Sequence, residues 1–424
     1  MKIVHISTHD SEGGAARAAY RLHTGLNQAG HDSQMLVRQK RTRDPKVKAL
    51  QSSNRFNERI RRFARRKQIQ RSIGQYATTV PSGYEPFHHE GSHLDKCLVG
   101  GIPECDIINL HYISEFVDFE TFFTTIANRI PVAWRLPDLH ALTGGCHFDM
   151  GCGKHTHGCG SCPQLGSKDQ EDLSAQIWKR RLRVLERINS NRLHFIALNH
   201  WMAKQIHASP LTEKFPVTII PNGLDATSFA PRDKAVCRDI LGLPQDAKII
   251  LFVADLVTNR RKGLHLLSNI IENVKEVENL TLLSIGDGKP DLKLNIPHHH
   301  MAKVSNDRLL STVYSAADIF VIPSLQDNLP NTVLEAMACK TPVAGFNVGG
   351  IPDMIRHGQT GLLAKEADSA DLGKAIQTIL SDDAMRSKMA QHSRDIVEQE
   401  YTLEIQAQRY TQLYDRILSM NRDK

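Results

Sequence analysis

Short hydrophobic runs alternate with longer helical patterns along most of the chain. The runs are rich in Val, Ile and Leu, and the segments between them carry apolar residues at helical spacing. This alternation is typical of parallel sheets with helices on both faces, an α/β fold of the doubly wound type. The runs predict ten strands: KIVHIS, SQMLVR, DIINLH, PVAWRL and LHFIAL in the first half, then VTIIP, KIILFVA, LTLLSIG, IFVIP and PVAGF in the second.

The alternation pauses at residues 207–233, which are punctuated by Pro, Gly and Asn. Such a segment suits a linker or a domain edge, and we place the boundary near Pro210. The chain of 424 residues is long enough for two domains of about 200 residues each. We expect Rossmann-like domains over 1–210 and 211–400, followed by 401–424 as an amphipathic helix with one apolar stripe: Leu403, Ala407, Tyr410, Tyr414 and Ile417.

Composition is that of an ordinary globular protein, 41% hydrophobic and 23% charged. No apolar run approaches the ~18 residues needed to span a bilayer. The opening MKIVHIST alternates like a strand, and His5 and Ser7 interrupt the apolar core that a signal peptide requires. The sequence therefore predicts a cytoplasmic protein.

The net charge of +7 has one local source. Thirteen Lys and Arg against two acids lie between Lys40 and Arg71. In residues 55–71, Phe56, Ile60 and Phe63 recur at i, i+4 and i+7, so a helix has one apolar stripe in a cationic surround. Such a helix is either a solvated surface helix that covers the domain or a surface that lies on anionic lipid headgroups. No nucleic-acid-binding motif accompanies the charge, and we expect no nucleic acid partner.

Candidate chemistry follows three of the predicted strands. Gly13-Gly14 after the first strand lets backbone N–H groups approach an anion, although a tight turn without a ligand has the same pattern. The segment NRRKG places Arg260, Arg261 and Lys262 after KIILFVA, where three cations could neutralise a diphosphate or simply be exposed. After IFVIP, Asp327 and Glu335 flank a helix start and could accept hydrogen bonds from sugar or ribose hydroxyls.

The motifs IIPNGLD, RRKG, AADIFVIPSLQDNLPNTVLEAMACKTPVAG and GGIPDMIRHGQTGLL, over residues 215–365, resemble the donor half of the retaining family-4 glycosyltransferases. The N-terminal GGAARAA and the Cys-rich segment are similar to a subgroup from bacterial surface polysaccharide synthesis, colanic acid transferases among them. The resemblance implies a GT-B fold, two Rossmann-like domains facing a central cleft. It also implies transfer of a sugar from a UDP- or GDP-linked donor to a lipid-linked oligosaccharide in exopolysaccharide, capsule or O-antigen synthesis, at the inner face of the membrane. No catalytic metal is expected.

By the same resemblance, Lys262 and the adjacent Arg261 bind the diphosphate, Glu335 the ribose and Asp327 the transferred sugar. Further donor contacts are expected from residues in the matching motifs: Gly13, Gly14, Asn222, Arg260, Asn328, Leu329, Pro330 and Asn331.

Two positions depart from the family pattern at the site. Asp327 stands where the family usually has Glu, and Pro137 stands where it usually has a His that helps to position donor sugar and acceptor. His140 or His111 could take over that role, although each could equally be a satisfied cleft histidine. Because the acceptor proton can pass to a phosphate oxygen, a protein base is not required. The alternative is a catalytically silent relative that binds nucleotide-sugar or lipid within an assembly complex.

Four of the eight cysteines lie within seventeen residues: Cys146, Cys152, Cys159 and Cys162, inside a loop at 144–166. A cytoplasmic chain keeps thiols reduced, so a disulfide framework is less favoured than a metal site. Four thiolates would give a closed tetrahedral structural zinc site. Reduced structural thiols are the next alternative, and an iron–sulfur cluster the last.

Overall fold

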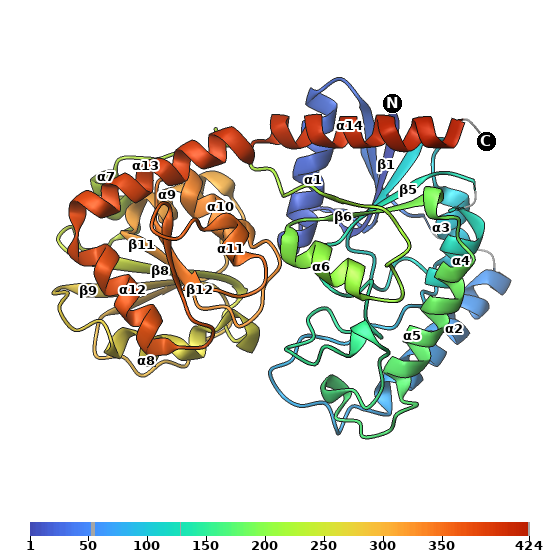
Figure 1. The fold of residues 1–424 in the computed structure, drawn as a ribbon, viewed down its shortest axis with the longest axis horizontal. Coiled ribbons are helices and arrows are strands. Elements are labelled where there is room, and N and C mark those ends of the chain that lie inside the picture. Colours follow the sequence, from blue (N-terminus) through green and yellow to red (C-terminus); the bar gives the residue numbers. More distant parts are fainter. Residues whose placement is uncertain (52–55, 128, 423–424) are drawn as a thin grey trace. The chain divides into compact units, whose positions relative to one another are not determined.

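The computed structural model describes residues 1–51, 56–127 and 129–422, which form two compact units (Figure 1). The N-terminal unit comprises Met1–Pro221 together with the chain from Gln406 onward, and the C-terminal unit comprises Asn222–Ile405. Residue 55 of the basic segment and residues 423–424 of the final predicted helix lie outside the described residues.

The N-terminal unit is built on a seven-stranded parallel sheet of order β3-β2-β1-β4-β5-β6-β7. Its central strands are buried on both faces, as expected for runs of Val, Ile and Leu in a parallel sheet. The strands are β1 (Lys2–His9), β2 (Asp32–Gln39), β3 (Val47–Ala49), β4 (Ile107–Leu110), β5 (Val132–Arg135), β6 (Leu193–Ala197) and β7 (Val217–Ile219).

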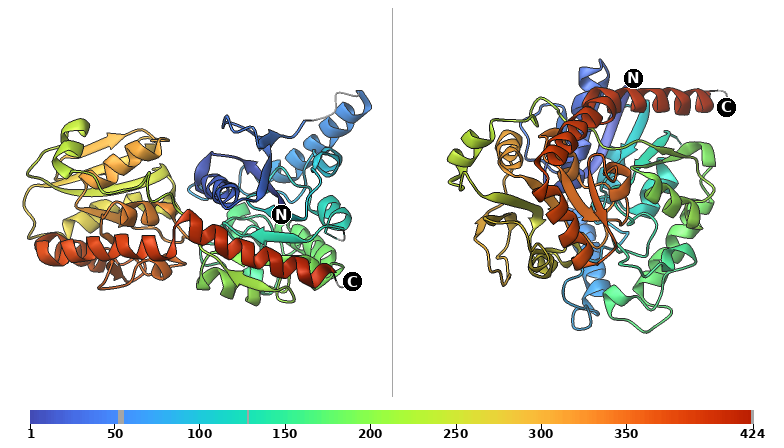
Figure 2. Two further views of the ribbon diagram at one scale, coloured as in Figure 1. Left: turned by 90° about the horizontal axis from the view of Figure 1, so that it is seen from above. Right: turned by 60° about the vertical axis from the view of Figure 1, so that its left-hand side comes forward.

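The helices of this unit are α1 (Gly13–Gln28), α2 (Phe56–Gly74), α3 (Asp95–Gly101), α4 (Phe119–Thr125), α5 (Leu173–Glu186), α6 (His200–Ala208) and α14 (Leu403–Arg422). The last helix lies beside α1 and buries Tyr410 and Tyr414 against Leu22 and Leu26 (Figures 1 and 2). The Tyr414 hydroxyl also accepts a hydrogen bond of 2.7 Å from Asn109 Nδ2 on β4. The apolar stripe read from the sequence is thus the packing face of α14.

The C-terminal unit contains a six-stranded parallel sheet of order β10-β9-β8-β11-β12-β13. Its strands are β8 (Lys248–Leu256), β9 (Leu280–Asp287), β10 (His298–Met301), β11 (Ile319–Ile322), β12 (Val343–Phe346) and β13 (Gly361–Ala364). The helices are α7 (Lys234–Leu241), α8 (Leu267–Glu272), α9 (Asp307–Ala316), α10 (Asn331–Ala338), α11 (Ile351–Met354), α12 (Ser369–Ser381) and α13 (Asp383–Glu400).

The structure corrects the predicted boundary between the two halves. The run VTIIP was assigned to the second half, but β7 pairs in parallel with β6, with Phe195 opposite Val217. The first sheet therefore includes this strand, and the chain changes unit after Pro221 rather than near Pro210.

Each sheet reverses its strand order at one point. In the N-terminal unit this point lies between β1 and β4, and in the C-terminal unit between β8 and β11. Ligands of open α/β sheets bind outside the carboxyl ends of the strands at such a switch point. The loops after these four strands are consequently the places to look for a site.

Candidate functional site

The loops after β8 and β11 bring two cations and one carboxylate together. Lys262 Nζ lies 2.6 Å from one carboxylate oxygen of Asp327, and Arg261 Nη1 lies 3.4 Å from the other. The two strands are direct neighbours, with Ile319 opposite Ile250, so their following loops meet at the switch point. The sequence-predicted residues Arg261, Lys262 and Asp327 therefore form one cluster, whereas Arg260 on the same turn is exposed.

The environment of Asp327 keeps it charged. Burial alone raises the pKa of this carboxyl, but the charges of Lys262 and Arg261 outweigh burial and hold the pKa below its usual 3.8. Ser324 Oγ at 3.3 Å and the Asn328 backbone N–H at 3.1 Å also donate to the carboxylate. Two cations against one anion leave a net positive charge, which suits an anionic ligand such as a diphosphate.

Two glycines let the surrounding loops approach this cluster. Gly263 has φ of +77°, and a Cβ there would lie 1.8 Å from the carbonyl oxygen of Pro323. Gly349 has φ of +56°, and its Cβ would lie 1.9 Å from the carbonyl oxygen of Asp327. Only glycine fits both the left-handed backbone and the close contact at these positions.

The N-terminus of α10 follows the Asp327 loop. Pro330 is the N-cap residue, and Asn331 is the first residue of the helix. Asn222 Nδ2 donates to Asn331 Oδ1 at 2.9 Å, which ties the segment after β7 to the start of α10. Asn328 and Leu329 are buried beside them. Apart from Arg260, the predicted donor-binding residues of this unit thus lie around the start of α10.

Glu335 lies one turn into α10 and is 3% exposed. Its Oε2 accepts a hydrogen bond of 3.1 Å from the hydroxyl of Tyr314 on α9. Tyr314 was not predicted as a site residue, because its relation to Glu335 arises only from the packing of α9 against α10. The pair shows that Glu335 is held by the protein in a fixed orientation.

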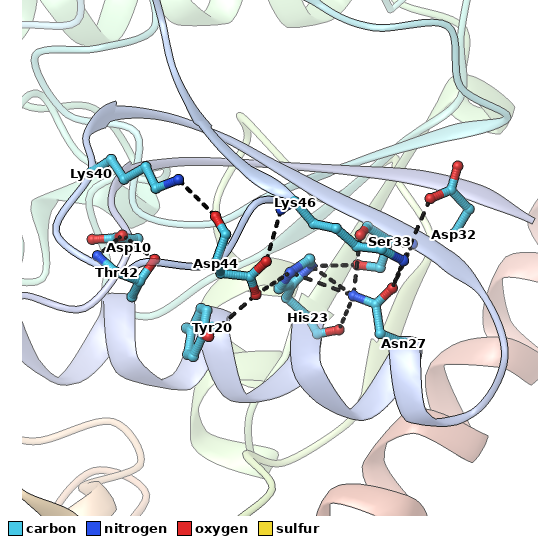
Figure 3. Close-up of polar contacts among 10 residues, drawn as sticks. All are labelled: Asp10, Tyr20, His23, Asn27, Asp32, Ser33, Lys40, Thr42, Asp44 and Lys46. Atoms are coloured by element: carbon cyan, nitrogen blue, oxygen red, sulfur yellow. Dashed lines mark hydrogen bonds and ion pairs between the residues drawn. The ribbon is translucent and has the colours of Figure 1, made fainter.

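In the N-terminal unit, Gly13 and Gly14 begin α1, directly after the loop that follows β1. Gly13 has φ of +83°, and the N-cap residue Glu12 makes no side-chain cap to the helix. Asp10 accepts the backbone N–H of Arg41 at 2.9–3.0 Å. It also accepts the backbone N–H of Thr42 at 2.8 Å, and Figure 3 shows these two residues side by side. The first turn of α1 therefore begins beside a loop that Asp10 anchors.

Further along α1, Asp44 anchors the β2–β3 loop to the helix. Its Oδ2 lies 3.3 Å from the Tyr20 hydroxyl and 3.4 Å from His23 Nε2 (Figure 3).

The loops after β4 and β5 hold the two histidines suggested as replacements for Pro137. His111 is 1% exposed, and its Nε2 lies 2.8 Å from Nδ1 of His5 on β1. His140 is 6% exposed, and its Nε2 lies 3.3 Å from Nη2 of Arg181 on α5. Burial holds the pKa of both histidines well below 6.5, so each is a neutral interior group.

The zinc prediction for the Cys-rich loop is not supported. Cys146, Cys152, Cys159 and Cys162 line one small pocket and are all free. Yet among residues 1–51, 56–127 and 129–422 no group of three or more His, Cys, Asp or Glu side chains is placed to hold a metal ion. Burial raises the pKa of Cys159 to about 12 and that of Cys146 well above 9.0, so without a bound cation these groups are thiols.

Hydrogen bonds and packing hold the Cys-rich loop instead. Cys159 Sγ accepts the Gly144 N–H at 3.2 Å, and Asp172 Oδ2 accepts the Cys162 N–H at 2.7 Å. Cys162 also packs with Leu165 and other apolar residues of a small satellite core. Reduced structural thiols, the second alternative from the sequence, agree with this arrangement.

Residues 247–382 match the family model described as "Glycosyl transferases group 1". A D-inositol 3-phosphate glycosyltransferase of Geodermatophilus obscurus is 30% identical over 188 residues, which cover 38% of this chain and 40% of that protein. An uncharacterized glycosyltransferase of Methanocaldococcus jannaschii, MJ1607, is 24% identical over 77% of this chain and 79% of its own. A putative teichuronic acid biosynthesis glycosyltransferase of Bacillus subtilis, TuaC, is 30% identical over 38% of this chain and 41% of its own.

Solved structures match the whole chain. A sucrose-phosphate synthase of Thermosynechococcus elongatus has a TM-score of 0.66 at 19% identity and covers 99% of this chain and 100% of its own. Anabaena HepE in complex with UDP and glucose has a TM-score of 0.63 at 14% identity, covering 98% and 100%. The fold is GT-B. The family match supports the group 1 glycosyltransferases, and the segment that carries it, 247–382, lies in the C-terminal unit.

The GT-B comparison clarifies which part of the chain is well matched in sequence. The segment 247–382 contains the Lys262, Asp327 and Glu335 positions, and the G. obscurus and B. subtilis relatives align over about two fifths of their length. The alignment with MJ1607 covers 77% of this chain and therefore also reaches into the N-terminal unit, at 24% identity.

Proposed function

We propose that the protein is a retaining glycosyltransferase that moves a sugar from a UDP- or GDP-linked donor to a saccharide acceptor. The observation that carries this proposal is the Lys262–Arg261–Asp327 cluster at the switch point of the C-terminal sheet. HepE was solved with UDP-glucose, and a starch synthase IV from Arabidopsis thaliana with ADP, so proteins of this shape bind nucleotide sugars or nucleotides.

In the proposed reaction, the leaving diphosphate is stabilised by Lys262 and Arg261. These cations act where negative charge develops as the sugar–phosphate bond breaks. Glu335, held by Tyr314, accepts hydrogen bonds from the ribose, and Asp327 accepts them from the transferred sugar.

We further propose a lipid-linked saccharide acceptor from bacterial surface polysaccharide synthesis. The likeness to TuaC, named for teichuronic acid biosynthesis, and to WaaG, described as involved in lipopolysaccharide biosynthesis, supports this choice. The similarity of GGAARAA and the Cys-rich segment to the colanic acid type points in the same direction.

Binding of a donor tests the first step. A nucleotide sugar present at 100 times its Kd should stabilise the protein by about 2.7 kcal/mol in thermal unfolding. Glu335→Gln keeps the side-chain shape and the Tyr314 contact but loses a charged acceptor, so donor affinity measured by calorimetry should fall about tenfold. Glu366→Ala, at an exposed position, is the control. No stabilisation by any UDP- or GDP-sugar would contradict the proposal.

The helix α2 offers a surface for the membrane at which such an acceptor resides. None of its residues is buried, and the bulky apolar side chains of its stripe face solvent: Phe56 is 73% exposed, Ile60 53% and Phe63 63%. The opposite side faces the unit, where Arg65 Nη2 lies 3.2 Å from Asp118 Oδ2. A helix that merely covered the domain would turn its apolar stripe inward, so this geometry favours the lipid alternative.

Exposed cations flank the same stripe, and the occupant we propose is an anionic lipid surface. Arg59, Arg66 and Lys67 are exposed. None of the helices in the described part of the chain is long and apolar enough to cross a bilayer. Contact through α2 would therefore be peripheral, with apolar side chains among the headgroups and cations beside lipid phosphates.

Each basic residue near an anionic membrane surface contributes about 1 kcal/mol to binding. Replacing Arg59, Arg66 and Lys67 together by Glu should therefore lower the affinity for vesicles that contain anionic lipid by at least about 100-fold. Sedimentation with vesicles of phosphatidylcholine and phosphatidylglycerol gives the measurement. The matched control is a second triple variant, in which Glu replaces three basic residues that are exposed elsewhere on the unit: Lys168, Arg183 and Arg187. Equal binding by the two triple variants would return α2 to the role of a solvated surface helix.

A further inference from the structure

A cavity of about 320 Å³ lies within the N-terminal unit, against the inner side of α2. Its other walls come from α5, from residues 89–91 and from residues 118–120 at the start of α4. All of these residues belong to the N-terminal unit, whereas the Lys262 cluster lies in the C-terminal unit. Ligand pockets span about 300–1,000 Å³, so this cavity suits a small ligand of about one or two rings.

Glu90 provides the cavity with a charged oxygen that no donor reaches. Its side chain is 9% exposed, and its Oε1 accepts a hydrogen bond of 2.5 Å from Arg180 Nε. Among the residues that the structure describes, none donates to Oε2. His89 Nδ1 lies 3.2 Å from Oε2, but it accepts the Gly91 N–H at 2.8 Å and therefore carries no proton in the neutral ring.

The charge states of these two side chains follow from their surroundings. Burial lowers the pKa of His89 below 6.5, so its ring is neutral at pH 7. Burial alone raises the pKa of Glu90, but His89 and Arg180 outweigh burial and hold the pKa below 4.5. Glu90 is therefore a carboxylate at neutral pH, with one oxygen open to a donor.

Arg181 provides the complementary donor. It is 1% exposed, and its Nη1 donates to the carbonyl oxygens of His140 and Thr143. Its Nε has no acceptor in the described part of the chain. Burial lowers the pKa of Arg181 to about 10, so the guanidinium keeps its charge at pH 7. Because a buried polar group without a hydrogen bond is costly, the two atoms favour a ligand that both donates and accepts.

The charges around the cavity balance. The charged side chains of its walls are three arginines and three acids: Arg65, Arg180, Arg181, Glu90, Asp118 and Glu120. Their formal charges sum to zero, so the cavity has no excess charge to attract a phosphate. Phe119, Leu173 and Val184 form apolar walls, and the amides of Gln68 and Gln176 lie at exposed positions. Paired charges and amides suit hydroxyl groups, and apolar walls suit the C–H face of a sugar ring.

We propose that this cavity is a binding site for an uncharged saccharide. Sugar hydroxyls can donate to Glu90 Oε2 and accept from Arg181 Nε, which satisfies both atoms. The inference goes beyond the proposed function, because binding here needs neither a nucleotide nor the Lys262 cluster. Since α2 forms one wall and turns its apolar stripe to solvent, a sugar in the cavity would lie beside the surface proposed to contact lipid.

Titration with free sugars tests the site. Glucose, galactose, N-acetylglucosamine and maltose are added to the protein, and binding is followed by saturation-transfer NMR. At least one of them should bind with a Kd of about 1–10 mM, the range expected for ligands of this size. The same Kd should be found in Lys262→Ala, because the substitution lies in the other unit.

Two variants locate the bound sugar. Glu90→Gln keeps its amide oxygen toward Arg180 Nε, which puts an NH₂ group in the place of Oε2, so sugar affinity should fall about tenfold or more. Gln176→Trp, at an exposed position of α5, fills the cavity and should abolish binding. The matched controls are Glu186→Gln and Lys179→Trp, at exposed positions of α5 outside the cavity. All four variants should unfold at temperatures near that of wild type.

The outcomes distinguish this inference from the proposed function. A wild type that binds none of these sugars at about 100 mM would overturn the saccharide site. Unchanged affinity in both Glu90→Gln and Gln176→Trp would also overturn it, since the sugar would then bind elsewhere. In Lys262→Ala, glucose 6-phosphate that bound about ten times more tightly than glucose would show an anion site instead. A protein that binds free sugars through Glu90 but no nucleotide sugar would keep this inference and contradict the proposed function alone.

Discussion

Replacing Lys262 with alanine is expected to lower kcat/KM for sugar transfer about 10²- to 10³-fold, equivalent to about 2.7–4 kcal/mol of transition-state stabilisation. Lys262 Nζ lies at the switch point of the C-terminal sheet, where its charge can meet the leaving diphosphate. Arg261 remains in the variant and still pairs with Asp327, so the loss should be large but incomplete. Initial rates of nucleoside diphosphate release over a range of donor concentrations give the measurement.

The matched control is Lys374→Ala, which removes an exposed lysine from α12 of the same unit. Its kcat/KM should stay within about twofold of wild type. If Lys262→Ala kept a third or more of the wild-type activity, the cluster would be a structural ion pair and not a diphosphate site.

The second large effect concerns stability. Asp318→Ala should lower the free energy of unfolding by about 3–5 kcal/mol, because it leaves a buried cation without its carboxylate partner. Asp318 is 5% exposed and accepts hydrogen bonds from Arg238 Nη2 at 2.7 Å, Lys234 Nζ at 2.8 Å and the Ile249 backbone N–H at 2.7 Å. These contacts join α7, β8 and the start of β11. Urea unfolding followed by circular dichroism measures the change.

The same carboxylate predicts a pH dependence. Burial raises the pKa of Asp318, but Lys234 and Arg238 outweigh it, and the pKa lies below 3.8 in the folded protein. The stabilisation is therefore fully present above pH 3.8 and is lost as pH falls through the folded pKa. The difference in free energy of unfolding between wild type and Asp318→Ala should become smaller in that acidic range. The exposed Asp239→Ala variant should show neither effect, and a loss below 1 kcal/mol for Asp318→Ala would contradict the account.

Much of the fold could be predicted from hydrophobic runs alone. All ten predicted strands are present, because strands buried on both faces of a parallel sheet read as continuous apolar segments. Two of the three strands that were missed lack this signal: β3 has three residues, and β10 reads HHHM, with His298 and His300 hydrogen-bonded to Ser284 on the neighbouring strand. The third, β13, reads GLLA and has four residues, the same length as β11 and β12.

The candidate site was predictable where chemistry follows directly after a strand. Arg261, Lys262 and Asp327 were found because neighbouring parallel strands end at the same edge of a sheet. The Tyr314–Glu335 hydrogen bond could not be found that way, since it arises only from the packing of α9 against α10. The orientation of α2 was also open, because periodicity shows that a stripe exists but not which way it faces.

Pro137 remains the residue that most sharply separates an active enzyme from a silent relative. If the acceptor proton passes to a phosphate oxygen of the leaving diphosphate, Pro137→His is not needed for turnover. If the site is silent, restoring the family histidine is the change that could create activity.

The most direct test is turnover of nucleotide sugars by the purified wild-type protein, with Lys262→Ala and Pro137→His assayed beside it. Each UDP- and GDP-sugar is incubated with the protein, with and without a lipid-linked saccharide fraction, and released nucleoside diphosphate is measured over time. The account predicts that the wild type turns over at least one donor, that Lys262→Ala loses about 10²-fold or more, and that Pro137→His gives no essential gain. A wild type that binds a nucleotide sugar without turnover, while Pro137→His becomes active, would contradict it.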